Sequence, residues 1–221
     1  MEALITRFHN EDLEFESVQE EFSRMEAGLS GERRLRQILN DYSFKEDTNI
    51  FYNFECINDN GYTHQMDALI CTSGYLLVVE VKQISGTLGY KPQQHESFRI
   101  TEAGAQENFL NPFDQALRHQ LFLESRLKLW NISLPVLYII VIANVRAKLD
   151  NSLQNFPIFH VNGMPSLLEK LHVKYPKNSV NLGFLQKQLE HLYSPLPQDD
   201  QSIEAESVKA CYVKNAALPM Q

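Results

Sequence analysis

Two carboxylates and a lysine are spaced in the sequence so that they can act together on one group. Asp67 and Glu80 lie in apolar segments that a short turn at 73–74 separates. If this is a two-residue hairpin turn, Asp67 stands directly opposite Glu80, and Gln65 stands opposite Lys82. Because side chains alternate along a strand, this register puts all four on one face of a sheet.

Opposed carboxylates between apolar strands repel, so one is protonated or a cation lies between them. A hard divalent ion suits the pair, because Mg²⁺ takes one or two carboxylates and fills its shell with waters and phosphate oxygens. Lys82, one strand period beyond Glu80, can hold or activate a water beside the phosphate. These are the parts for metal-assisted phosphodiester hydrolysis. The alternative is a strand whose Glu-x-Lys end emerges into solvent. A three-residue turn, in place of the two-residue turn, would shift the pairing of Asp67 with Glu80.

The elements that must position these residues predict an α/β domain with a mixed central sheet, in the order helix, three strands, helix, strand. We expect strands at 50–57, 62–72, 75–82, 135–143 and 157–161, and helices at 11–27, 30–42, 111–130, 165–173 and 182–193. Gly28 and Gly31 predict a break between the first two helices. The polar stretch from 86 to 110 is expected to be a long loop.

A third carboxylate, Glu32, shares the apolar face of the helix at 30–42, three residues before Leu35 and seven before Leu39. A carboxylate on an inward helix face needs a partner. The later helix has a capping Asn111, a proline at its first position and an acidic first turn. His64, His119 and His160 are expected to be core or surface histidines rather than metal ligands.

The 221 residues carry a formal net charge of −8, and the acidity lies at the ends of the chain. Residues 1–29 sum to −6 and residues 194–221 to −2, while residues 30–193 are neutral. We therefore expect an acidic helical extension (1–29), one domain (30–193), and a linker with a C-terminal tail (194–221). The extension is a solvated helix, or alternatively a segment that competes with phosphate for a basic groove.

Membrane and secreted classes are not supported. The longest apolar run, Val136 to Ala143, is too short to span a bilayer. The N-terminus lacks a basic start followed by an apolar core, so it is not a signal peptide. Three scattered cysteines form neither a disulfide framework nor a zinc site, and they fit a reducing compartment. We expect a cytoplasmic protein with no membrane partner.

An ordered set of short motifs between residue 30 and about residue 145 resembles the nuclease-related domain (NERD) family, which is placed in the PD-(D/E)XK nuclease superfamily. The motifs are Gly31-Glu32, Gln65-Met66-Asp67-Ala68-Leu69-Ile70, Gly74, Val79-Glu80-Val81-Lys82, Ser85-Gly86, Asn111-Pro112 and Gln115. Met66 and Ala68 depart from the family pattern of a β-branched residue before the aspartate and often a histidine after it. The resemblance implies a restriction-endonuclease-like core in which a mixed sheet is flanked by helices.

The resemblance also implies a role for each site residue. Asp67 and Glu80 would bind Mg²⁺ or Mn²⁺, with the carbonyl of Val81 as a third ligand. Lys82 would position the attacking water or stabilise the developing charge. Glu32 would reach the metal or its water shell. Gln115 would orient the lysine or the phosphate, although a hydrogen bond at the helix start explains it equally well.

Nucleic acid, in particular DNA, is the partner that this reading implies. Arg33, Arg34 and Arg118 are the candidate phosphate contacts. Other cations that could contact phosphate are Arg36, Lys91, Arg99, Arg126 and Lys128. The sequence thus predicts a metal-dependent nuclease. The alternative is a non-catalytic nucleic-acid-binding or scaffold module in a DNA-processing or defence assembly, and the intact Asp67, Glu80 and Lys82 set favours the enzyme.

Overall fold

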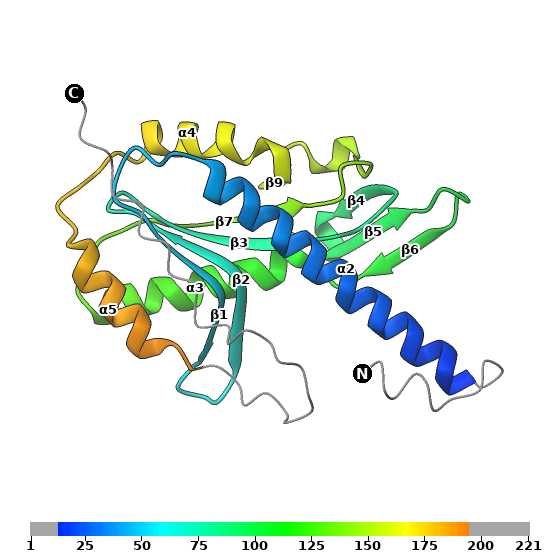
Figure 1. The fold of residues 1–221 in the computed structure, drawn as a ribbon, viewed down its shortest axis with the longest axis horizontal. Coiled ribbons are helices and arrows are strands. Elements are labelled where there is room, and N and C mark those ends of the chain that lie inside the picture. Colours follow the sequence, from blue (N-terminus) through cyan, green and yellow to red (C-terminus); the bar gives the residue numbers. More distant parts are fainter. Residues whose placement is uncertain (1–12, 195–221) are drawn as a thin grey trace.

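The computed structural model describes residues 13–194, and a five-stranded sheet lies at its centre (Figure 1). The strand order is β1-β2-β3-β7-β9, in which β1, β2 and β3 pair antiparallel while β3, β7 and β9 pair parallel. The bounds are β1 Asn49–Ile57, β2 Thr63–Cys71, β3 Leu76–Lys82, β7 Val136–Ile142 and β9 Ile158–His160. The expected mixed sheet is confirmed.

A second sheet of four strands, in the order β6-β5-β4-β8, occupies the stretch predicted to be a loop. Its strands are β4 Thr87–Lys91, β5 Glu96–Ile100, β6 Gln106–Phe109 and β8 Lys148–Leu149. The prediction of a long loop is therefore wrong. These strands carry many polar side chains, and β4 buries three consecutive residues, Leu88 to Tyr90, so the alternation that identifies a half-buried strand is weak in them.

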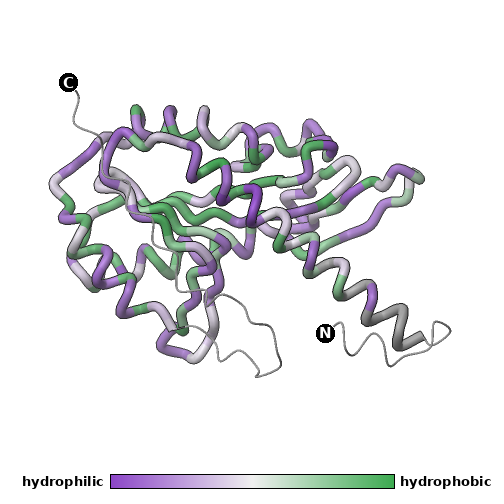
Figure 2. Tube along the Cα trace, in the orientation of Figure 1, coloured by the Kyte–Doolittle hydropathy of each residue, from purple (hydrophilic) through white to green (hydrophobic). Residues whose placement is uncertain are grey.

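Helices cover both faces of the central sheet (Figure 1). They are α2 Leu13–Asp41, α3 Pro112–Leu129, α4 Met164–Lys174 and α5 Leu182–Leu192, with 3₁₀ turns η1 Pro92–Gln94, η2 Asn151–Leu153 and η3 Val161–Gly163. The most hydrophobic stretches are strands of the central sheet (Figure 2). No helix within residues 13–194 is long and apolar enough to cross a membrane.

The buried side chains divide between the two faces of the sheet. On one face, Leu35 and Leu39 of α2 pack with Leu168 of α4 against β2, β3 and β7. On the other face, Leu123 of α3 and Leu185 of α5 pack against β1, β2 and β3. The C-terminal end of β3 therefore lies between α2 on one side and α3 on the other, which is where the predicted site residues fall.

The predicted break at Gly28 and Gly31 is wrong, because α2 is one continuous helix from Leu13 to Asp41. Gly31 instead allows a close approach: a Cβ there would lie 3.2 Å from both Val81 Cγ1 and Ala143 Cβ. The helix thus contacts the end of β3 through a residue without a side chain. The division of the chain at residue 30 stays a prediction, and residues 1–12 and 195–221 of the two predicted extensions lie outside the described residues.

Candidate active and metal-binding site

The predicted register of β2 and β3 is confirmed from Cys71 as far as Ala68, which pairs with Val79. The ladder then ends. At the next position the Asp67 carboxylate accepts a hydrogen bond from the backbone N–H of Val81, with an Oδ2–N distance of 2.6 Å. The side chain of Asp67 thus takes the place of a ladder hydrogen bond at the point where the two strands separate.

A local irregularity in β1 accompanies this separation. Asn53 has a φ of +51°, and it does not pair with Asp67 although its neighbours Tyr52 and Phe54 keep their partners. Tyr52 and Ala68 pack on the α2 face, whereas Phe54 and Met66 pack on the α3 face. Simple alternation therefore fails here.

One predicted member of the site is lost through this irregularity. Gln65 is exposed and pairs with Glu55 of β1, so its predicted position opposite Lys82 is wrong. The reason is that β2 pairs with β3 only from Ala68 onward.

Glu80 and Lys82 form an ion pair at the end of β3. Lys82 Nζ donates to Glu80 Oε1 at 2.7 Å, and the Glu80 side chain is 2% exposed while that of Lys82 is 26% exposed. The second oxygen, Glu80 Oε2, is buried and has no hydrogen-bond partner of good geometry among residues 13–194. A buried carboxylate oxygen in this state is unusual, because such atoms are normally satisfied by protein, water or an ion.

The carboxylates resist ionisation in this environment. Burial, followed by repulsion from Asp67, raises the pKa of Glu80 to about 7, although Lys82 and the Gln115 side chain oppose the shift. Burial also raises the pKa of Asp67, against the hydrogen bond from Val81 and the charge of Lys82. Two desolvated carboxylates with raised pKa values, side by side, form an environment that a cation would relieve.

Glu32 approaches the same carboxylate pair from the side of the sheet that α2 covers. It is partly buried on α2, and burial followed by the charge of Asp67 raises its pKa, while Arg36 and a hydrogen bond from Asn53 lower it. The structure therefore brings Glu32, Asp67, Glu80, Lys82 and Gln115 together, as the sequence predicts. Their catalytic roles stay a prediction.

The donor set fits a hard divalent cation. Two carboxylates and a neighbouring backbone carbonyl supply only oxygen atoms, which Mg²⁺ and Mn²⁺ prefer. Within residues 13–194, no group of three or more His, Cys, Asp or Glu side chains is placed to hold a metal ion. A pair of carboxylates is a donor set that suits Mg²⁺, which commonly binds one or two carboxylates and keeps several waters.

The three arginines predicted to contact phosphate lie on different sides of this site. Arg118 is exposed on α3, three residues beyond Gln115. Arg33 is exposed on α2, but Arg34 Nη2 donates to Asn162 Oδ1 of η3 at 3.4 Å. Arg34 therefore extends toward η3, and phosphate binding by these arginines stays a prediction.

Other predicted cations already have acidic or aromatic partners. Lys91 pairs with Glu96, Arg99 with Glu107 and Arg126 with Asp59, while Arg36 lies over the ring of Tyr52. A phosphate would have to compete with these partners.

Next to the site lies a buried histidine pair that the sequence reasoning missed. The Nδ1 atoms of His64 on β2 and His119 on α3 are 3.0 Å apart, and both residues are buried. His64 stacks on Phe122 with a centroid distance of 4.1 Å. The packing of α3 against β2 brings together two histidines that are 55 residues apart in the sequence. The sequence around neither histidine indicates this contact.

Acid should destabilise the chain through this pair. Burial, with His64 nearby, lowers the pKa of His119 to about 4, and burial also lowers the pKa of His64. The unfolded chain binds a proton near pH 6.5, so stability is lost as the pH falls from about 6.5 toward 4. At pH 5 the loss from His119 is about 2 kcal/mol relative to pH 8.

Urea unfolding at pH 5, 6.5 and 8 would measure this dependence. His119→Leu should remove the contribution of this histidine, so the free energy of unfolding of the variant relative to wild type should rise by about 2 kcal/mol between pH 8 and pH 5, whatever the substitution does at pH 8. His191→Gln, at an exposed position on α5, should keep the wild-type dependence. An unchanged pH dependence in His119→Leu would show that acid acts elsewhere.

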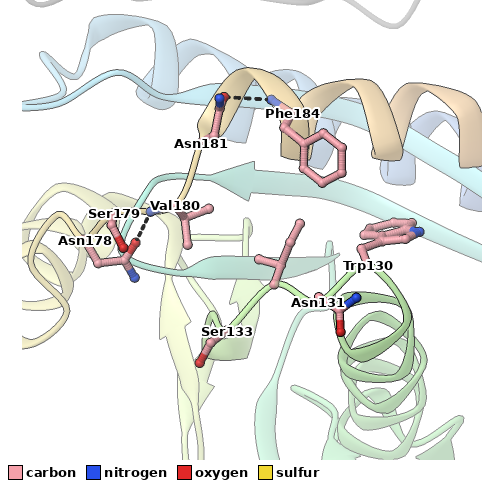
Figure 3. Close-up of a pocket in the computed structure, with 9 residues that line it drawn as sticks. Trp130, Asn131, Ser133, Asn178, Ser179, Val180, Asn181 and Phe184 are labelled. Carbon is pink, nitrogen blue, oxygen red and sulfur yellow. Dashed lines mark hydrogen bonds between the residues drawn. The ribbon is translucent and has the colours of Figure 1, made fainter.

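A separate hollow at the other end of α3 lacks this chemistry (Figure 3). It lies between the C-terminal end of α3 and the start of α5, and Trp130, Ser133 and Phe184 are among its lining residues. Asn181 caps α5 there, accepting from Phe184 N at 3.0 Å. Within residues 13–194, no carboxylate or cation lines this hollow.

Comparison with known proteins agrees with the motifs. The model of the nuclease-related domain family matches residues 27–143, just over half of the chain. No curated protein matches the chain. Among solved structures, the small subunit of the heterodimeric restriction endonuclease R.BspD6I matches with 13% identity and a TM-score of 0.32, covering 74% of this chain and 78% of that one. On the strength of the family match, this chain belongs to the nuclease-related domain family.

Proposed function

We propose that this nuclease-related domain is a divalent-metal-dependent nuclease that hydrolyses phosphodiester bonds of DNA. The observation that carries the proposal is the buried Glu80, which lies beside Asp67 and in an ion pair with Lys82, and whose Oε2 has no hydrogen-bond partner of good geometry within residues 13–194. Two desolvated carboxylates next to a lysine are costly to stability. A fold retains such an arrangement more readily at a functional site than elsewhere.

Asp67, Glu80 and the carbonyl of Val81 would hold Mg²⁺ or Mn²⁺. Such an ion, when bound, polarises a phosphate oxygen and lowers the pKa of its water. The hydrogen bond from Val81 N to Asp67 fixes the aspartate against the strand end, so this ligand is already ordered. Ordering before binding reduces the entropic cost of assembling the site.

Lys82 would place a positive charge beside the reacting phosphate. Its ammonium group is held by Glu80 Oε1 at 2.7 Å, yet the side chain stays partly exposed and can contact a substrate. Gln115, in the first turn of α3, would orient Glu80 or a phosphate oxygen. Glu32 would hold a water on the α2 side of the site.

A cleavage assay tests the function. We expect the chain to cut DNA in Mg²⁺ or Mn²⁺ and to be inactive in chelator. Linear and covalently closed circular substrates, compared in parallel, distinguish an exonuclease from an endonuclease, and an RNA of the same sequence tests substrate class. Binding of DNA without cleavage in either metal would support the non-catalytic module instead.

Metal binding can be measured without any substrate. Mg²⁺ or Mn²⁺ should raise the melting temperature, because a ligand at 100 times its Kd stabilises the native state by about 2.7 kcal/mol. Asp67→Asn should abolish most of this shift, since the amide can still accept the hydrogen bond from Val81 but carries no charge. Asp41→Asn, at an exposed position near the end of α2, is the matched control. An equal shift in wild type and Asp67→Asn would place the metal elsewhere.

A further inference from the structure

Beyond Lys82 the chain enters a polar hollow that the proposed catalytic residues do not use. Seven polar or charged side chains line it: Ser85, Thr87, Thr101, Glu102, Asn144, Arg146 and Lys148. Its volume is about 390 Å³, whereas one water occupies roughly 30 Å³ in the liquid. The hollow therefore has room for a phosphate and the sugar attached to it.

Its two cations have no acidic partner. Arg146 and Lys148 are exposed, and neither forms an ion pair with any residue between 13 and 194. By contrast, Lys91 of β4 and Arg99 of β5 each form an ion pair with a glutamate. A phosphate at Arg146 and Lys148 would thus displace no existing ion pair.

Backbone hydrogen bonds fix the chain at both cationic residues. Asn144 accepts a hydrogen bond from the backbone N–H of Arg146 at 3.0 Å, which closes a turn at the end of β7. Lys148 N donates to Gly86 O at 2.9 Å, where β8 runs parallel to β4. Gly86 has a φ of +92°, and a Cβ there would lie 2.4 Å from Ile100 O. The backbone around the hollow is therefore held by hydrogen bonds within the chain and by close packing at Gly86.

The hollow lies close to the proposed reaction centre. Ser85 follows Lys82 by three residues, so their Cα atoms are at most about 10 Å apart. The ends of β3 and β7 are joined by a hydrogen bond from Ala143 N to Lys82 O at 3.0 Å. Each nucleic-acid strand presents one phosphate per about 3.4 Å of duplex axis. When one phosphate of a strand lies at Lys82, another phosphate a few nucleotides along the same strand can therefore reach the hollow.

We propose that this hollow is a phosphate subsite for the nucleic-acid backbone, with Arg146 and Lys148 as its cations and the hydroxyl and amide groups as hydrogen-bond partners. The inference rests on the proposed function and extends it to strand positioning. The contacts involve no base edges, so the subsite should contribute affinity and register without sequence preference.

Salt dependence of DNA binding tests the subsite. We would compare wild type with Arg146→Gln/Lys148→Gln, using the full chain, a 30-base-pair labelled duplex and chelator to prevent cleavage. Losing one phosphate contact should reduce the slope of log Kobs against log salt by about 0.9. We expect affinity at low salt to fall roughly tenfold, with a smaller loss as salt rises.

Two matched controls separate a local contact from net charge. Lys177→Gln/Lys187→Gln removes the same charge; Lys187 is exposed on α5 and Lys177 on the segment before it, away from β4 and β8 (Figure 1). It should change affinity less than twofold. Glu102→Gln removes the one carboxylate among the described residues that line the hollow, and it should tighten binding. Equal losses in the two double variants would overturn the subsite.

Other outcomes separate this proposal from the nuclease itself. Normal cleavage with unchanged binding in Arg146→Gln/Lys148→Gln overturns the subsite and leaves the nuclease standing. If wild type binds DNA but never cleaves it, and Arg146→Gln/Lys148→Gln binds DNA more weakly than wild type, the subsite is supported and the nuclease is overturned. If 10 mM inorganic phosphate raises the wild-type melting temperature while Arg146→Gln/Lys148→Gln binds DNA as tightly as wild type, the hollow is a small-anion site and the proposal is wrong.

Discussion

Lys82→Met should reduce the rate of DNA cleavage by about 100-fold or more. Removing one preorganised charge at a reacting centre typically costs about 10²–10³ in kcat. Methionine fills a similar volume, so the end of β3 should keep its packing. Lys82 is one cation among several on this surface, and DNA affinity should therefore change far less than the rate.

Single-turnover cleavage at saturating enzyme measures the rate separately from binding. Lys170→Met, at an exposed position on α4, should cleave like wild type. Lys82→Arg distinguishes two roles: a group that acts only through its charge would keep part of the activity, whereas one that must release or share a proton would not. Full cleavage by Lys82→Met would refute the assignment.

The turn between β2 and β3 shows what the sequence could predict. Thr72 Oγ1 accepts hydrogen bonds from Gly74 N at 3.1 Å and from Tyr75 N at 2.9 Å, which closes the tight turn assumed from the sequence. The absence of a side chain at Gly74 is also required, since a Cβ there would lie 2.2 Å from Tyr175 O. The register that follows correctly aligned β2 with β3 from Cys71 as far as Ala68.

The separation of the strands at Asp67 could not be predicted in the same way. It depends on Asn53 adopting a positive φ on a neighbouring strand, and on Asp67 binding a backbone N–H in place of a ladder partner. Neither feature leaves a local pattern in the sequence. Glu32 and Glu80 both interact electrostatically with Asp67, the residue at which the strands separate.

Tertiary contacts also explain the other two incorrect predictions, the long loop at 86–110 and the break in α2. The strands between residues 86 and 110 are stabilised by pairing with one another and with β8, so their side chains need not alternate. Continuity of α2 through its glycines reflects burial of Leu35 and Leu39 against the sheet, which outweighs the weak helix propensity of glycine.

Glu80→Gln should stabilise the metal-free chain while abolishing cleavage. Burial and Asp67 raise the pKa of Glu80 to about 7, so the native state binds a proton that the unfolded state has released. The stability that Glu80 contributes to wild type therefore falls as the pH rises from about 4.5 to 7, opposite in sign to the contribution of His119. Glutamine resembles the protonated acid, and the variant should gain about 2–3 kcal/mol at pH 8 and almost nothing at pH 4.

Urea unfolding in chelator at pH 4 and pH 8, beside a cleavage assay in Mg²⁺, measures both effects on the same variant. Glu26→Gln, at an exposed position on α2, should change stability by less than about 0.5 kcal/mol at either pH and should cleave normally. Mg²⁺ should reverse the order of stability, because wild type binds the ion through a carboxylate that the variant lacks. A merely structural glutamate would give the opposite result, a variant that loses stability at pH 8 through the broken pair with Lys82 and still cleaves DNA. Gain of stability with loss of activity is the combination expected when a fold keeps a strained charge for its chemistry.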